Sequence, residues 1–270
     1  MKSLEVQVSD HVATVSLLGP GKGNALGPDF WQECPGVFDD LDARDDVRVV
    51  ILKGKGEHFS YGLDLKAMIG DLGPHMSPDG LAKERTKLLD LVGRLQRSGD
   101  AIARCRKPTI AAIAGWCIGG GVDLVSACDI RLASKDAKLS VRETRVAMVA
   151  DLGSLQRLPR IVGQGLAREL AFTGDDVDAD RALRIGLVND VFADRAALDE
   201  GALALARRIA KNPPLVVQGV KQVLDYCDGK IVRDGERFVA VWNAAFLASK
   251  DLSEALAAFA ERREPSYRGE

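Results

Sequence analysis

Residues 111–151, AAIAGWCIGGGVDLVSACDIRLASKDAKLSVRETRVAMVAD, hold the unusual residues of this 270-residue chain. A strand predicted over residues 109–114 leads through three consecutive glycines, Gly119, Gly120 and Gly121, into a helix that we expect to begin near residue 122. Glycines at such a junction let the backbone approach a ligand closely, and the first amides of a helix have no acceptor within it. The stretch therefore predicts a backbone site for an oxyanion or another anion.

Three carboxylates, Asp123, Glu143 and Asp151, lie within this stretch among Val, Leu, Ala and Met, where a charge is costly unless it is paired or used. For two of them a purely structural role is an alternative to a role in chemistry. Asp123 falls in the first turn of the predicted helix, where it complements the helix dipole, and Asp151 is placed to cap residues 152–158. Glu143 has no such alternative. Eight residues correspond to about 80° on an unbroken helix, so Glu143 and Asp151 can share a cavity only if residues 144–150 turn and break.

A second turn, HFSYGLDL at residues 58–65, repeats this design more weakly. It follows a buried strand predicted over residues 47–53, contains Gly62, and leads into a helix that we expect to begin near Leu63 and Asp64. Two such turns are able to aim two backbone N–H groups at one oxygen. Asp64 has the alternative of complementing the helix N-terminus.

The remaining chain predicts a recurring strand, strand and helix pattern, and then a change of character. From residue 198 onward it is Ala-rich and helical, without a predicted strand, which indicates a core domain over residues 1–197 and a helical oligomerisation module over residues 198–270. The other predicted elements are a hairpin at 4–8 and 12–17, helices at 28–42, 81–104, 152–162, 165–172 and 178–185, a strand at 187–192, and a loop or helix break at 70–80.

Composition and motif spacing exclude several functions. A net charge of −2 argues against nucleic acid, and the absence of an apolar run near about 18 residues or of a signal sequence argues against a membrane. Five cysteines without a CxxC pair indicate reduced thiols and a cytoplasmic location. No metal site is expected, because the three histidines lie far apart and no HExxH occurs. Glycine-rich residues 19–27 match neither dinucleotide nor phosphate-loop spacing, and Ser154 stands in LGSLQ instead of GxSxG.

Together these motifs resemble the crotonase (enoyl-CoA hydratase/isomerase) superfamily over nearly the whole chain. The segments that carry the resemblance are GNAL (23–26), HFSYGLDL (58–65), KPTIAAIAGWCIGGGVDLVSACDIRLAS (107–134), LGSLQRLPRIVG (152–163) and AFAERREPSYRG (258–269). The resemblance implies an α/β fold, a crotonase-like spiral of ββα units followed by a C-terminal α-helical trimerisation module, assembled as a homotrimer or homohexamer. It also implies an acyl-CoA thioester substrate and no separate cofactor, because CoA enters as part of the substrate.

The same resemblance implies a site built on both glycine turns. Its oxyanion hole is formed by the backbone N–H groups of Leu63 and Gly120. The other implied substrate-binding residues lie in the same two turns: Ser60, Tyr61, Gly62, Asp64, Leu65 and Gly119. Tyr61 departs from the family pattern, since it replaces the small residue usual in the FSxG loop.

One branch of the superfamily, the Δ3,5-Δ2,4-dienoyl-CoA isomerases of fatty acid β-oxidation, is similar to this chain in carrying Asp, Glu and Asp at the positions of Asp123, Glu143 and Asp151. Typical hydratases carry Glu at the first position and Gly at the third. The resemblance implies that Asp151 removes a proton at C2, Glu143 delivers one at C6, and Asp123 orients or tunes them. Two alternatives remain: a 2-enoyl-CoA hydratase, in which Asp123 and Glu143 activate a water molecule, and a non-catalytic acyl-CoA-binding member.

Overall fold

The computed structural model describes residues 1–21, 23–75 and 81–270. Its larger sheet has six strands in the order β1-β2-β3-β4-β6-β9. Only the β1–β2 hairpin in this sheet is antiparallel, and the other neighbours pair in parallel. The bounds are β1 (Leu4–Ser9), β2 (Val12–Leu17), β3 (Val49–Gly54), β4 (Thr109–Ile113), β6 (Ile130–Ser134) and β9 (Asp190–Phe192).

A smaller sheet of three short strands lies beside the first, in the order β5-β7-β8. These strands are β5 (Trp116–Ile118), β7 (Lys138–Ser140) and β8 (Val177–Asp178). From β4 to β7 the chain alternates between the sheets: β4 and β6 belong to the larger sheet, and β5 and β7 belong to the smaller one. The predicted recurrence of two strands and a helix is this alternation.

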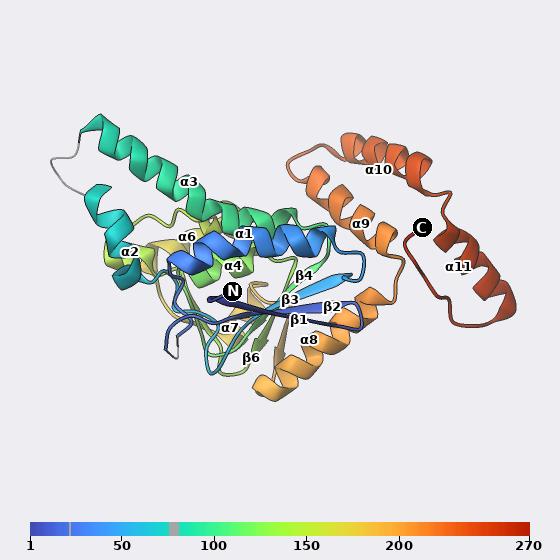
Figure 1. Ribbon diagram of the computed structural model, residues 1–270, viewed down its shortest axis with the longest axis horizontal. Coiled ribbons are helices and arrows are strands. Elements are labelled where there is room, and N and C mark those ends of the chain that lie inside the picture. The colour runs from blue at the N-terminus through green and yellow to red at the C-terminus, as the bar shows by residue number, and fades with distance from the viewer. Residues whose placement is uncertain (22, 76–80) are drawn as a thin grey trace.

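Helices cover both faces of the larger sheet (Figure 1). One face carries α1 (Pro28–Ala43), α3 (Ala82–Arg104) and α4 (Gly120–Ala127). On α1 the buried residues Phe30, Cys34, Phe38 and Leu41 recur every three or four positions, as expected for a helix with one apolar face. This packing encloses the main hydrophobic core between the helices and the sheet.

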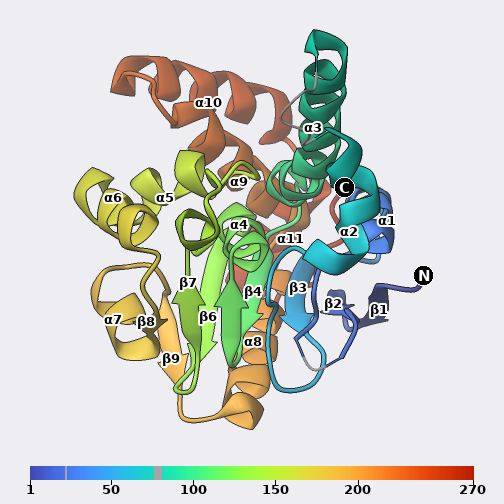
Figure 2. The ribbon, with the colours of Figure 1, turned by 90° about the vertical axis from the view of Figure 1, so that its left-hand side faces the viewer.

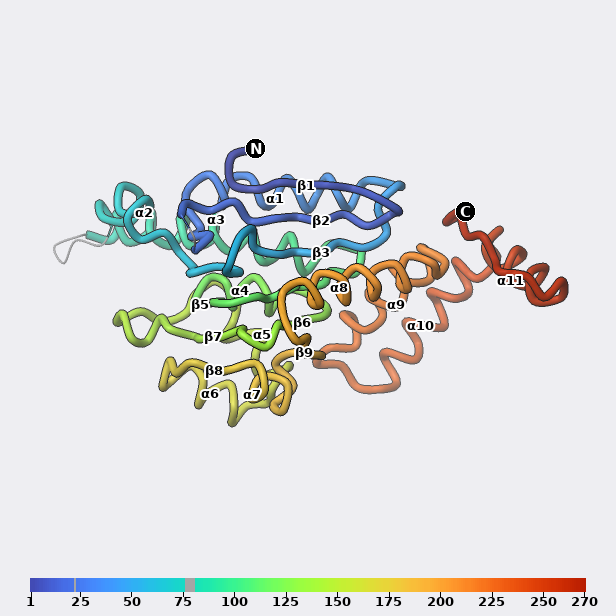
Figure 3. The backbone as a smooth tube through the Cα atoms, turned by 90° about the horizontal axis from the view of Figure 1, so that it is seen from below, coloured from blue at the N-terminus to red at the C-terminus, as the bar shows by residue number. Residues whose placement is uncertain are grey.

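The opposite face carries α8 (Arg195–Ala210), which lies over the strands in Figure 3. Its buried residues Leu198, Ala202, Ala206 and Ala210 recur every four positions and form a second core with residues of β2, β3, β4 and β6. Small alanine side chains let the helix lie close to the sheet. The predicted boundary between residues 197 and 198 falls inside this helix.

Short helices and 3₁₀ turns make up most of the remaining connections. They are α2 (Leu65–Leu72), η1 (Gly73–His75), η2 (Glu143–Val146), α5 (Ser154–Val162), α6 (Gln164–Thr173) and α7 (Ala179–Arg184). Of the two predictions for residues 70–80, a loop or a helix break, the helix break is confirmed, because α2 ends at Leu72 and the 3₁₀ turn η1 follows. Residues 76–80 lie outside the described residues.

Three C-terminal helices extend away from the sheets (Figures 1 and 3). They are α9 (Pro214–Cys227), α10 (Val232–Phe246) and α11 (Lys250–Glu261). An ion pair attaches α9 to the core, with Nζ of the buried Lys221 2.8 Å from Oδ2 of the more exposed Asp129. Arg48 attaches the C-terminal tail by donating to the carbonyl oxygen of Tyr267 at 2.7 Å. Among the helices that the structure describes, none combines the length and apolar character needed to cross a bilayer.

Candidate active site

The two glycine turns meet directly. Gly62 has φ +81°, and a Cβ there would lie 2.6 Å from the Ile118 carbonyl oxygen and 3.0 Å from the Gly120 nitrogen. A Cβ on Gly120 would in turn lie 3.5 Å from the Leu63 nitrogen. Within residues 1–21, 23–75 and 81–270, neither the Leu63 amide nor the Gly120 amide donates a hydrogen bond. The structure thus brings together two unpaired backbone donors, at the positions expected from the sequence.

Hydrogen bonds fix the first turn. The buried Ser60 hydroxyl donates to the Asn24 carbonyl oxygen at 2.8 Å and accepts from the Gly62 amide at 3.0 Å. Leu26 N donates to Gly62 O, and Asp64 N donates to Leu26 O. These bonds flank the Leu63 amide and hold it in place without using it.

Asp64 caps α2. Its Oδ1 accepts a hydrogen bond from the Ala67 amide at 3.0 Å, which confirms the expected contact with the helix N-terminus. Leu65, the first residue of α2, is exposed, as is Tyr61 in the turn before it. Gly119 has φ +51° and donates its amide to the Ser140 carbonyl oxygen, which aligns the second turn with β7.

Asp123 lies on α4 and is almost completely buried. Its Oδ1 accepts a 2.6 Å hydrogen bond from the amide of Ser154, the first residue of α5. The alternative that Asp151 caps this helix is wrong, because Gly153 occupies the N-cap position and Asp123, from another element, satisfies the free amide. The sequence carries no local signal for this long-range contact.

Glu143 begins the 3₁₀ turn η2, which ends at Ala147 with φ +59°. The expected break between Glu143 and Asp151 is therefore confirmed. Glu143 Oε1 lies 3.0 Å from where a Cβ of Gly119 would stand, so its carboxyl group adjoins the second glycine turn. Its Oε2 is buried and has no hydrogen-bond partner in the described part of the chain.

The three acids influence one another. Burial, together with smaller effects of the Asp123 and Asp151 charges, raises the pKa of Glu143 to about 7. Burial also raises the pKa of Asp123 to about 6, against the lowering effect of the Ser154 hydrogen bond, and the charge of Asp151 adds to the rise. Asp151 keeps more solvent contact, yet partial burial of its carboxyl group still raises its pKa. Acids with such pKa values can gain and lose protons near neutral pH.

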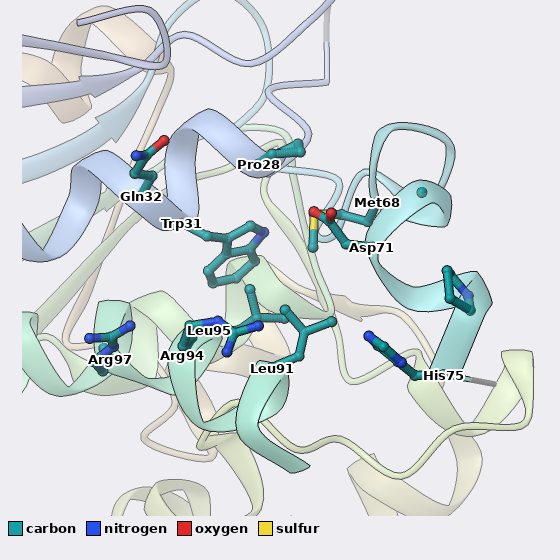
Figure 4. A pocket seen from close by; sticks show the side chains of 12 residues that line it. Pro28, Trp31, Gln32, Met68, Asp71, His75, Leu91, Arg94, Leu95 and Arg97 are labelled. Atoms are coloured by element: carbon teal, nitrogen blue, oxygen red, sulfur yellow. The ribbon is translucent and has the colours of Figure 1, made fainter. Parts of the chain in front are cut away.

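A separate cavity of about 470 Å³ lies between α1, α2 and α3. In Figure 4 the Trp31 ring faces Leu91 and Leu95 across it, and Met68 lies on the α2 side. None of the three acids lines this cavity. Its wall is nevertheless tied to the first turn, since Trp31 Nε1 donates to Leu26 O at 3.0 Å. The unpaired amides and the acids, not this cavity, form the candidate site of reaction.

Comparison with known proteins identifies the family of this chain. The family model described as Enoyl-CoA hydratase/isomerase matches residues 7–270. The chain belongs to the enoyl-CoA hydratase/isomerase family. The structure is also similar to that of an enoyl-CoA hydratase from Bacillus anthracis, with a TM-score of 0.90 and 32% identity over 99% of this chain and 100% of that one. The predicted crotonase-type α/β fold is confirmed.

Within this family, two curated relatives carry the name of the expected branch. The mitochondrial Delta(3,5)-Delta(2,4)-dienoyl-CoA isomerase of Dictyostelium discoideum is 44% identical over 98% of this chain and 90% of its own length. The human mitochondrial protein of the same name is 42% identical over 94% of this chain and 77% of its own length. Both likenesses span the two glycine turns and the three acids.

Proposed function

We propose that this protein is an isomerase that converts 3,5-dienoyl-CoA into 2,4-dienoyl-CoA in fatty acid β-oxidation. The observation that carries the proposal is the convergence of Asp123, Glu143 and Asp151 beside the free amides of Leu63 and Gly120. The names of the most similar relatives support the same reaction.

The amides would stabilise the intermediate. Removal of a proton from C2 of the 3,5-diene leaves an extended enolate, conjugated with both carbon–carbon double bonds, whose negative charge develops on the thioester oxygen. Leu63 and Gly120 would donate to this oxygen without first breaking another hydrogen bond. In another enzyme, loss of one comparable donor costs roughly 2.7–4 kcal/mol of transition-state stabilisation.

The acids would move the protons. Asp151 keeps the most solvent contact of the three, which favours the carboxylate form that a base at C2 requires. Burial raises the pKa of Glu143 to about 7, so a large fraction holds a proton at neutral pH and can deliver it to C6. Asp123, fixed by the Ser154 amide, would orient the other two. The cycle closes when the proton on Asp151 leaves and Glu143 regains one.

The critical experiment uses Asp151→Asn. Asparagine preserves size, and no helix cap is lost, because Asp151 does not cap α5. We expect kcat for 3,5-dienoyl-CoA to fall by roughly 10²–10⁴, with loss of C2 hydrogen exchange into deuterated solvent, followed by NMR. Glu143→Gln should instead allow some C2 exchange while blocking delivery to C6.

The same preparation should be tested on 2-enoyl-CoA. Likeness to the Bacillus anthracis hydratase keeps hydration as the second candidate, with water activated by Asp123 and Glu143. An Asp151→Asn protein that isomerises at the wild-type rate would favour the hydratase. Wild-type protein that binds acyl-CoA but turns over neither substrate would instead support a non-catalytic member.

We also propose that α9, α10 and α11 form contacts between subunits in a homotrimer or homohexamer. Supporting this, a groove of about 280 Å³ between these helices is lined mainly by apolar residues. Exposed apolar residues of this region include Val216, Val220, Leu224, Phe246, Leu247 and Phe259. Light scattering at micromolar concentration should give a trimer or larger, and a monomer would contradict the proposal. A cytoplasmic location and independence from any added cofactor also stay predictions.

A further inference from the structure

Arg157 on α5 carries a positive charge into the interior beside the candidate site. Its side chain is 20% exposed, and its Nη2 lies 3.0 Å from Oδ1 of Asp100 on α3, an aspartate that is 55% exposed. Nη1 is buried, and none of the residues that the structure describes accepts a hydrogen bond from it. Because solvent screens the half-exposed Asp100, the ion pair leaves much of the charge of Arg157 uncompensated on its buried side.

Two glycines make room for the guanidinium group. A Cβ on Gly153, the N-cap residue of α5, would overlap Nη1, and a Cβ on Gly99 of α3 would lie 3.2 Å from the same atom. Both helices pack on α4, which carries Asp123, and they flank it in Figure 2. The guanidinium group is therefore fixed at the junction of three helices, by backbone that admits no side chain.

The guanidinium group lies next to the hydrogen bond that holds Asp123. Gly153, which it contacts, directly precedes Ser154, whose amide donates to Asp123 Oδ1 at 2.6 Å. Burial raises the pKa of Asp123 to about 6, and the positive charge of Arg157 acts against this rise. The charges that act on the pKa of Glu143 are instead those of Asp123 and Asp151. Arg157 thus distinguishes between two neighbouring acids.

Four charged or titratable groups face Asp123 from the elements around it: Cys117 of β5, Glu143, Asp151 and Arg157. The Cys117 thiol stays neutral, because burial raises its pKa well above the usual range and the charge of Asp123 adds to the rise. Glu143 and Asp151 are negative when ionised. Arg157 is the positive group among the four, so it favours the carboxylate form of Asp123.

We propose that Arg157 is a positioning residue that decides which of two buried acids holds a proton, by keeping Asp123 ionised and leaving the proton on Glu143. The inference rests on the proposed function, in which Glu143 delivers this proton to C6. The pKa values of about 6 for Asp123 and about 7 for Glu143 place a shared proton mainly on Glu143. Without the cation, Asp123 would compete for the same proton.

The experiment compares Arg157→Gln, which removes the charge, with Arg157→Lys, which keeps it. Arg160→Gln is the matched control, since Arg160 is an exposed cation on the same helix. With 3,5-dienoyl-CoA near neutral pH, Arg157→Gln should lower kcat roughly 3- to 30-fold relative to this control. Exchange of C2 hydrogens with deuterated solvent should persist, because Asp151 is not affected, and Arg157→Lys should recover most of the isomerisation rate.

Three results with these variants would overturn the proposal. An equal loss of C2 exchange and isomerisation in Arg157→Gln would show that Arg157 only holds the segment that carries Asp151. A kcat of Arg157→Gln equal to that of the control would show that the charge has no role. An Arg157→Lys protein as slow as Arg157→Gln would show that shape and not charge matters.

Urea denaturation at pH 5 and pH 8 tests the charge without any turnover. A raised pKa in the folded state means that stability is lost as pH rises through that pKa, and removal of Arg157 raises the pKa of Asp123 further. Between these pH values, the folded-to-unfolded ratio of Arg157→Gln should therefore fall roughly 10-fold further than that of Arg160→Gln. Arg157→Lys should follow the control.

The denaturation result separates this inference from the proposed function. If the wild type fails to isomerise dienoyl-CoA but the pH dependence differs as expected, the proposed reaction fails and the effect of Arg157 on Asp123 stands. An equal pH dependence of Arg157→Gln and Arg160→Gln would reject that effect, whatever reaction the enzyme catalyses.

Asp100→Asn provides the test if Arg157→Gln does not fold. Asp100 is half-exposed, and its loss leaves Arg157 with a stronger effect on Asp123. The folded-to-unfolded ratio of Asp100→Asn should fall less than that of the wild type between pH 5 and pH 8, by up to about threefold. An equal or larger fall would overturn the proposal.

Discussion

Replacing Glu143 with Gln should make the folded protein more stable at alkaline pH while removing the acid. Burial raises the pKa of Glu143 from 4.5 to about 7. The folded protein therefore binds the proton more tightly than the unfolded chain does. Its free energy of unfolding is highest where both states are protonated and decreases as pH rises from about 4.5 to 7. Gln is neutral at every pH, so it escapes this loss.

The magnitude follows from the size of the pKa change. At about 1.4 kcal/mol for each tenfold change in proton affinity, a rise from 4.5 to about 7 corresponds to roughly 3 kcal/mol. Part of the side chain keeps solvent contact, so the lower end of 2–3 kcal/mol is the better expectation. The advantage of Glu143→Gln should grow from less than about 1 kcal/mol at pH 5 to about 2–3 kcal/mol at pH 8.5.

Urea denaturation of both proteins at these two pH values measures the difference. Protein concentration must be equal throughout, because subunit association adds to apparent stability. Glu200→Gln, an exposed change on α8, is the matched control for loss of one negative charge. A stability difference that is the same at pH 5 and pH 8.5 would show that the pKa of Glu143 is not raised and would refute the reasoning.

Three other changes test separate parts of the structure. Gly120→Val should lower turnover by more than about 10² without unfolding the protein, because a Cβ there lies 3.2 Å from Leu26 Cδ1 and crowds the amide pair. Wild-type activity in a folded variant would place the oxyanion site elsewhere. Asp129→Ala should cost roughly 1–3 kcal/mol of stability, seen in thermal denaturation, since it leaves the buried Lys221 ammonium without its ion-pair partner and removes the acceptor of the Thr109 amide. Lys221→Met should cost less. The kcat of the wild type should fall as pH rises through about 7, where Glu143 loses the proton it delivers, and a constant kcat from pH 6 to 9 would contradict its role as the acid.

Much of the fold and the site was predictable because the signals are local. Three consecutive glycines mark a turn that no other residue permits, and the helical offset between Glu143 and Asp151 required the break that the structure contains. Strands of two or three residues, such as β7 and β8, are too short to show a periodic pattern. Their conformation comes from pairing with each other and with β5.

Two other features depend on distant contacts. The Ala-rich, strandless sequence from residue 198 onward predicts a separate helical module, yet Ala202, Ala206 and Ala210 on α8 pack closely on the larger sheet. The sequence offers Asp151, the nearest acid, only as an alternative cap for α5. The contact with Asp123 crosses 31 residues and becomes visible only when the chain is folded.

Through its hydrogen bond to Ser154, the Asp123 carboxylate contributes both to the fold and to the proposed reaction. The amide of Ser154 at the start of α5 donates to the carboxylate of Asp123 on α4, so a residue of the candidate site fixes where α5 begins. Mutational drift at position 123 is therefore constrained twice. Substitutions that keep an oxygen acceptor can preserve the fold while silencing proton transfer, whereas apolar ones should loosen the junction between α4 and α5 as well. Asn and Leu at position 123 would separate these two constraints.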